Sequence, residues 1–332
     1  SPITTLVNDL GYVLCAALGC LWAIAGKIAV GNVQAMLEYT WRFAEPFSAI
    51  AGMVGSFGAA AAAGNRIFGL LDAEEEIPDS DQCIVPDDRS GRVTFENVTF
   101  GYTPDHLLMN GIDLTVEPGQ KVAVVGPTGA GKTTLINLLM RFYEVNNGSI
   151  KVDGTKITDM PREELRDRFG MVLQDTWLFE GTVRENLVYC TPNVSDERMK
   201  EACRAVGLDH FVRTLQHGYD TVLNDQVNLS QGQKQQLTIA RAMIADKPML
   251  ILDEATSSVD TRTELQIQNA MDELMKNRTS FVIAHRLSTI KNADLILMLK
   301  DGDVIESGTH EELLAKKGFY ADLYNSQFDK AS

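Results

Sequence analysis

A glycine-rich segment near the middle of the chain constrains the fold more than any other feature. Residues 126–133 read Gly-Pro-Thr-Gly-Ala-Gly-Lys-Thr and fit the pattern GxxxxGK[ST]. The apolar run Lys121–Val125 predicts a buried strand just before it, and a helix should follow from Lys132. Glycines let consecutive backbone N–H groups face a phosphate, and a helix N-terminus adds partial positive charge. The order of strand, loop and helix therefore predicts a nucleotide-binding α/β domain.

Particular side chains of this loop are predicted to contact ATP. Lys132 would reach the β- and γ-phosphates, and the Thr133 hydroxyl would ligate Mg²⁺. The remaining predicted ATP contacts in the loop are Gly126, Pro127, Thr128, Gly129, Ala130, Gly131 and Thr134. The alternative is a plain glycine-rich turn, which the flanking strand and helix disfavour.

A second apolar run, Met249–Asp253, ends in two acidic residues. A carboxylate at the end of such a strand can hold Mg²⁺ directly or through water, and Asp253 is predicted to do so. Glu254 would then polarise the attacking water as a general base. A solvated loop acid after a core strand would be the better interpretation if the phosphate-binding loop were absent.

Strand and helix patterns alternate through the second half of the chain. Arg92–Phe100 and Ser280–Ala284 read as further strands, while Pro161–Ala245 has a helical pattern in which Ser195 is a predicted N-cap. This alternation predicts a largely parallel sheet.

The first 70 residues have a different character. Leu10–Val30 contains one charged residue and is long enough to cross a bilayer as a helix, and Pro46–Ala63 contains none. We expect two long helices over residues 1–70, separated near Gly31 and Asn32. Small residues in the second would allow close helix packing in lipid.

Three charged residues, Glu38, Arg42 and Glu45, share one face of the second predicted helix. Charges at membrane depth often mark a transport path. An interfacial ion pair explains the same spacing.

The acidic balance of the chain limits its partners. A formal net charge of -15 argues against nucleic acid, whose binding depends on clustered Lys and Arg. Many of the Asp and Glu residues lie within residues 71–90, which we interpret as a solvated linker. The five cysteines are scattered and lack the spacing of a zinc site, so reduced thiols are expected.

Residues 228–233, Asn-Leu-Ser-Gln-Gly-Gln, resemble the signature motif of the ABC superfamily. Together with the phosphate-binding loop and the acidic strand end, they extend the resemblance over about 91–328, the predicted nucleotide-binding domain. The family fold is a phosphate-loop NTPase cassette with a mixed sheet core and a helical subdomain. Residues 65–72 resemble the end of the membrane domain of ABC exporters, so 1–70 is predicted to be the C-terminal part of such a domain.

The resemblance implies further site residues. Tyr102 is similar to the aromatic residue that stacks on adenine, Gln174 to the glutamine that senses Mg²⁺ and water, and His285 to the histidine that contacts the γ-phosphate. Taken alone, each of the three would more often be structural. Ser258 and Asp260 resemble the loop through which two cassettes communicate, and residues 182–187 resemble the segment that contacts the membrane domains.

The resemblance also implies how two chains cooperate. The signature residues expected to meet the ATP of a partner subunit are Leu229, Ser230, Gln231, Gly232 and Gln233. Gln231 stands where the commonest signature has Gly, and its side chain is expected to point away from the phosphate. ATP hydrolysis would then require a head-to-tail pair of cassettes, either a homodimer or a heterodimer of half-transporters.

The fused order of membrane helices and cassette implies an exporter, because importer ATPases of this family are separate soluble chains. The implied location is the plasma membrane, as a multi-pass protein with its ATPase domain in the cytoplasm. A small amphipathic substrate, multidrug or lipid, is expected. The alternative is a non-transport ABC ATPase that acts as a mechanical or binding module, and carbonate washing of membranes would release such a protein.

Overall fold

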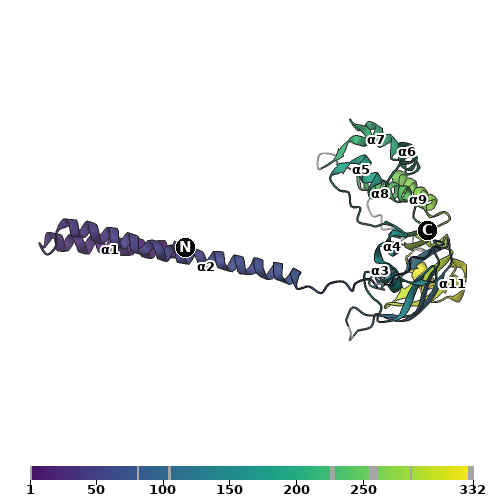
Figure 1. Cartoon of the computed structure of the whole chain (residues 1–332), viewed down its shortest axis with the longest axis horizontal. Coiled ribbons are helices and arrows are strands. Elements are labelled where there is room, and N and C mark those ends of the chain that lie inside the picture. Colours follow the sequence, from purple (N-terminus) through teal and green to yellow (C-terminus); the bar gives the residue numbers. More distant parts are fainter. Residues whose placement is uncertain are drawn as a thin grey trace. The chain divides into compact units, whose positions relative to one another are not determined.

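The computed structural model describes residues 2–80, 82–103, 106–224, 229–253, 261–284 and 286–327 (Figure 1). The chain divides into two compact units, residues 1–77 and 78–332.

The first unit is a pair of helices, α1 (Pro2–Ile24) and α2 (Val30–Leu71). The break lies at residues 25–29, where Gly26 has a φ of 72°, so Gly31, predicted at the break, falls in the first turn of α2. Val33 of α2 packs against α1 at Gly19, where an added Cβ would lie 2.9 Å from Val33 Cγ1. A glycine at this contact lets the two helices approach closely.

Hydropathy distinguishes these two helices. Among the described residues, one segment, Leu6–Ile24 of α1, is long and apolar enough to cross a membrane. The more polar α2 includes Pro46 and the exposed ion pair between Arg42 and Glu38, whose Nη2 and Oε1 atoms are 2.9 Å apart. That α2 also crosses a membrane stays a prediction.

The second unit contains the strands. A four-stranded antiparallel sheet has the order β2-β1-β4-β5, a six-stranded sheet has the order β12-β11-β3-β10-β9-β6, and β7 pairs with β8. The strands are β1 (Val93–Phe100), β2 (Met109–Val116), β3 (Lys121–Val125), β4 (Asn147–Val152), β5 (Thr155–Lys156), β6 (Phe169–Val172), β7 (Gly181–Thr182), β8 (Val222–Leu223), β9 (Met249–Asp253), β10 (Thr279–Ile283), β11 (Leu295–Lys300) and β12 (Asp303–Gly308).

The six-stranded sheet is parallel except for the pairing of β11 with β12. Its central strands are buried on both faces, which is why they read as continuous apolar runs. In β9, Met249 and Ile251 enter the core shared with the antiparallel sheet, while Leu250 and Leu252 pack into the helical side. The predicted mixed sheet and helical subdomain are confirmed.

Helices cover these sheets, and α5 to α9 gather at one end of the second unit (Figure 1). The helices are α3 (Lys132–Leu139), α4 (Arg162–Asp167), α5 (Val183–Val188), α6 (Asp196–Ala205), α7 (Asp209–Thr214), α8 (Gln231–Ala245), α9 (Thr261–Met275), α10 (Leu287–Lys291), α11 (His310–Lys316) and α12 (Phe319–Gln327), with 3₁₀ turns at Ile157–Asp159 and Gly218–Asp220. Ser195 caps α6 as predicted, since its hydroxyl accepts a hydrogen bond from the Arg198 N–H.

Three buried arginines bind the segment that follows the first unit. Arg168, which is fully buried, donates to the carbonyl oxygens of Pro86 and Asp88, each at 2.6 Å. It also pairs with the buried carboxylate of Asp153 at 2.8 Å. We call Arg141, Arg162 and Arg168 the arginine cluster.

The other two members of the arginine cluster bind Asp79. The Nη1 atoms of Arg141 and Arg162 each lie 2.9 Å from Asp79 Oδ1. Burial acts to raise the pKa of Asp79, but the Arg162 N–H and the two guanidinium charges outweigh it and hold that pKa below its ordinary value. Asp79 is therefore held by two arginines although, like Glu74 to Glu76, it is exposed. That residues 71–90 form a solvated linker stays a prediction.

Candidate functional site

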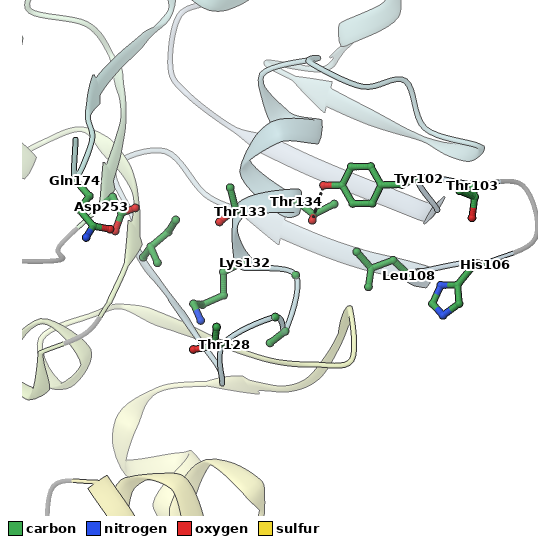
Figure 2. Close-up of a pocket in the computed structure, with 14 residues that line it drawn as sticks. Tyr102, Thr103, His106, Leu108, Thr128, Lys132, Thr133, Thr134, Gln174 and Asp253 are labelled. Atoms are coloured by element: carbon green, nitrogen blue, oxygen red, sulfur yellow. Dashed lines mark hydrogen bonds between the residues drawn. The ribbon is translucent and has the colours of Figure 1, made fainter. Parts of the chain in front are cut away.

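A cavity of about 580 Å³ opens where the parallel strands of the six-stranded sheet end. The loop after β3, the end of β9 and the segment after β6 all reach it, because parallel neighbours bring their carboxyl ends to one edge. Ten of the predicted residues line it: Tyr102, Thr128, Gly129, Ala130, Gly131, Lys132, Thr133, Thr134, Gln174 and Asp253 (Figure 2).

The phosphate-binding loop has glycines at positions where a residue with a side chain would fit poorly. Gly131 has a φ of 98° at the N-cap of α3, a conformation that favours glycine. An added Cβ at Gly126 would lie 2.3 Å from the carbonyl oxygen of Leu299 in the neighbouring strand. The loop is thus shaped by close approach to β11 and by the left-handed turn into α3, and it leaves the first N–H groups of α3 at the cavity.

Lys132 supplies the positive charge of the cavity. Its Nζ atom donates to the carbonyl oxygens of Gly126 at 2.7 Å and Pro127 at 3.0 Å, so the loop backbone orients the ammonium group. Burial lowers the pKa of Lys132, and the negative charge of Asp253 opposes that shift. A polyphosphate in the cavity would favour the charged lysine in the same way.

The residues present fit a magnesium ion. Asp253 Oδ1 is buried and accepts no hydrogen bond from the residues that the structure describes. Such an orphaned carboxylate oxygen is costly unless a cation or donor satisfies it. The Thr133 hydroxyl lines the same cavity, and Mg²⁺ in phosphate sites usually takes one or two protein carboxylates, with waters and phosphates as the other ligands.

The far end of the cavity is aromatic and apolar. Tyr102 is 54% exposed, and its hydroxyl lies 2.9 Å from Thr134 Oγ1 on α3 (Figure 2). Thr103, His106, Leu108 and Ile283 also line the cavity and were not predicted. A hydrogen bond from the Leu108 N–H to the Phe100 carbonyl oxygen and a β-bridge between Thr103 and His106 hold the first three there.

A polar residue at the end of β6 completes the cavity. Gln174 lies two residues after that strand and is exposed, beside Asp253 in Figure 2. Its amide can donate to or accept from a ligand. That Gln174 senses Mg²⁺ or water stays a prediction.

The signature residues lie at the start of α8. Ser230 is the N-cap, and its hydroxyl accepts a hydrogen bond from the Gln233 N–H at 3.2 Å. The Gln233 side chain accepts in return from the Ser230 N–H at 2.9 Å, which completes a capping box. Gln231 is exposed and Gly232 is buried. None of the signature residues is among the described residues that line the cavity.

Four predicted site residues lie outside the described residues. These are Glu254, Ser258, Asp260 and His285. The described neighbours of two of them have definite positions, since Asp253 ends β9 and Ala284 follows β10, which pairs with β9 in parallel. The roles assigned to the four residues stay predictions.

Comparison with known families and proteins agrees with this geometry. The family profile described as "ABC transporter" matches residues 109–257. A "Fatty acid ABC transporter ATP-binding/permease protein" of Mycobacterium tuberculosis is 50% identical over 323 residues, which are 97% of this chain and 51% of that protein. An "ATP-dependent lipid A-core flippase" of Syntrophus aciditrophicus is 39% identical over 329 residues, 99% of this chain and 55% of the flippase. The chain therefore spans about half the length of the curated relatives it matches.

A solved structure is similar over nearly the whole chain. The "Structure of a bacterial Atm1-family ABC exporter with ATP bound" superimposes with a TM-score of 0.72 at 34% sequence identity. The similarity covers 98% of this chain and 57% of that one.

Proposed function

The chain belongs to the ABC transporter superfamily and resembles its exporters, and from this premise we propose that it is the C-terminal part of an exporter half-transporter that hydrolyses ATP. The observation that carries the proposal is that Lys132, held by the loop backbone, and the orphaned Asp253 Oδ1 line the same cavity. A cation for the phosphates and a carboxylate oxygen that accepts no hydrogen bond from the described residues suit a magnesium nucleotide.

We infer that different residues of the cavity bind different parts of the nucleotide. The phosphate-binding loop and Lys132 would hold the β- and γ-phosphates, and Tyr102 would stack on the base. Thr133, Asp253 and Gln174 would hold the metal ion, which when bound offsets phosphate charge. Glu254 would accept a proton from the attacking water.

The site would be completed by a second chain. Ser230 and the N-terminus of α8 offer an anion-binding helix end that is separate from the described cavity lining. We infer that this end meets the γ-phosphate held by a partner, with Ser258 and Asp260 at the junction. The partner is a second half-transporter, identical or related.

We infer a membrane location with the cassette in the cytoplasm and both α1 and α2 crossing the plasma membrane as part of a multi-pass domain. The apolar Leu6–Ile24 segment supports this, and so do the exporters to which the chain is similar. Among the expected substrates, a lipid or fatty-acyl amphiphile is favoured over a drug, because the relatives are named for fatty acid and lipid A.

Two substitutions test the ATPase proposal on the purified chain. Lys132→Ala should abolish ATP binding, whereas Glu254→Gln should retain binding and lose turnover. Equilibrium binding of a fluorescent ATP analogue and phosphate release, measured on the same preparations, separate the two effects. Turnover by Glu254→Gln at the parent rate would show that another group is the base.

The substrate is tested on the complete gene product in inside-out vesicles. ATP-dependent uptake of a labelled fatty acid, with lipid A and a cationic dye measured in parallel, should favour the fatty acid. The matched control is the same vesicle carrying Lys132→Ala. Preference for the dye would contradict the proposed lipid substrate.

A further inference from the structure

Tyr143 lies beside the proposed base-binding residue but was not predicted as part of any site. It follows α3, and 45% of it is exposed. Its ring centroid is 5.1 Å from that of Tyr102, with an interplanar angle of 90°. Phe100 completes a set of three mutually contacting rings, 5.0 Å from Tyr102 and 5.8 Å from Tyr143. Edge-to-face contacts of this kind are attractive beyond simple burial.

These contacts hold Tyr102 in one orientation. Two rings touch its ring, and Thr134 on α3 holds its hydroxyl at 2.9 Å. About half of Tyr102 nevertheless stays exposed and available to a ligand. A tyrosine held in this way does not have to give up rotamer freedom when a base stacks on it, so the binding surface is preorganised.

The turn that carries Tyr143 is itself fixed. Arg141, with a φ of 53°, is buried and binds Glu144 Oε1 at 2.8 Å and Asp79 Oδ1 at 2.9 Å. Phe142, between Arg141 and Tyr143, lies under the Arg166 guanidinium at 5.0 Å. The position of Tyr143 is therefore set by the backbone and by the arginine cluster.

We propose that Tyr143 is a positioning residue for nucleobase binding, which acts by holding Tyr102 in the orientation that stacks on the base. The proposal rests on the proposed function, in which Tyr102 contacts the base of ATP. Tyr143 is not among the described residues that line the cavity, so its effect would pass through Tyr102.

The test compares a ligand that has a base with one that has none. Calorimetric Kd values are measured on the full chain for Mg-ATP and for inorganic triphosphate with Mg²⁺. Tyr143→Ala should weaken Mg-ATP binding about two- to tenfold, the range expected for one aromatic pair, and leave triphosphate binding unchanged. Tyr143→Phe keeps the ring and should bind both ligands like the parent.

A general structural defect in Tyr143→Ala would weaken the binding of both ligands, and that result would overturn the inference. Unchanged ATP affinity in Tyr143→Ala would overturn it as well. The double variant Tyr102→Ala/Tyr143→Ala should bind ATP no more weakly than Tyr102→Ala. Additive losses would mean that Tyr143 acts independently of Tyr102, which also overturns it.

If the proposed function is wrong, the pattern of affinities differs from the pattern expected when only the role of Tyr143 is wrong. If Tyr102→Ala binds ATP like the parent, Tyr102 is not the base-binding residue and the assignment under the proposed function is wrong. If Tyr102→Ala is weakened and Tyr143→Ala is not, the positioning role alone is wrong.

Discussion

At the scale of single residues, the position of Asp253 predicts two opposite effects on a nucleotide. Its orphaned oxygen would ligate a metal ion, but without metal its charge would repel phosphate in the cavity that Lys132 also lines. We predict that Asp253→Asn weakens Mg-ATP binding roughly tenfold or more, since metal sites are sensitive to changes even beyond their ligands. Metal-free ATP should bind as tightly as to the parent, or more tightly. Titrations with ATP in EDTA and in Mg²⁺ measure both.

The control for this prediction removes a charge elsewhere. Asp246 follows α8 and pairs with Arg278 on the surface. Asp246→Asn should leave both affinities unchanged, which separates the local effect of Asp253 from the net charge of the cassette. Equal weakening of ATP with and without Mg²⁺ in Asp253→Asn would contradict the metal-binding role.

At the scale of elements, two serines cap helices in the same way, so their variants separate the effect of losing a helix cap from the effect of losing a ligand contact. Ser230 caps α8 and Ser195 caps α6, each by accepting a hydrogen bond of 3.2 Å from the N–H three residues later. Replacing either with Ala should cost about 1 kcal/mol of stability. Only Ser230→Ala should also lower turnover, by about ten- to hundredfold, since it would lose a bond to charged phosphate. Thermal unfolding and phosphate release are the measurements.

Because Ser230→Ala and Ser195→Ala should lose similar amounts of stability, any difference in their turnover reports the ligand contact. Similar turnover in Ser230→Ala and Ser195→Ala would mean that the signature serine is only a cap.

The arginine cluster makes a second prediction at this scale. Arg168→Ala leaves the buried Asp153 carboxylate without its charged partner, although the N–H groups of Gly91 and Arg92 still donate to it, and should lower the free energy of unfolding by about 3–5 kcal/mol. Arg89→Ala removes a half-exposed arginine that pairs with Glu164, which Arg168 also contacts, and should cost less than about 1 kcal/mol. Urea unfolding can be followed at Trp177, the one tryptophan of residues 78–332, after the other two are changed to Phe. Equal losses in the two variants would show that burial of Arg168 contributes nothing.

Local patterns explain which elements could be predicted. The strands Lys121–Val125 and Met249–Asp253 were predicted with the bounds that the structure has. Each has a strong signal of its own, a short apolar run that ends at a motif. The antiparallel strands β2, β4 and β5 were missed because they are short or carry exposed polar residues and are defined by pairing with distant strands.

Long-range contacts explain what the sequence could not reveal about the site. The bond from Arg141 to Asp79 joins residues 62 positions apart, and that from Arg168 to Asp88 joins residues 80 apart. Tyr143 carries no motif, and only the fold brings its ring to that of Tyr102. His106 and Leu108 also carry no motif, although they lie only a few residues after Tyr102 in the chain. Thr128 to Thr134, by contrast, are contiguous in the chain, so their shared position at the cavity could be predicted from spacing alone, although Gly126 and Pro127 of the same motif are not among the described residues that line it.

At the scale of the whole molecule, the proposed pairing of two chains predicts that an inactive variant and a strongly impaired one restore each other's turnover. Lys132→Ala damages the site held by its own loop, whereas Ser230→Ala damages the site of its partner. A pair with one chain of each kind keeps one complete site. An equal mixture should therefore recover roughly a quarter of parent turnover if the subunits of a symmetric pair exchange freely and the sites are independent.

Phosphate release before and after mixing measures this recovery. The control mixes two separate preparations of Lys132→Ala, which should stay inactive. An inactive mixture of Lys132→Ala and Ser230→Ala, with chain exchange shown by fluorescence transfer between labelled subunits, would contradict a site shared between chains.

The attachment of Asp79, Pro86 and Asp88 to the arginine cluster has a practical consequence for anyone who redesigns this protein. A recombinant cassette cloned from Gly91 would omit Asp79 and the carbonyl oxygens of Pro86 and Asp88, and Arg168 would lose two of its acceptors. A clone that starts at Pro78 keeps all of them. Chimaeras that graft foreign helices onto this cassette should accordingly be spliced upstream of Pro78, because the segment after it belongs to the same compact unit.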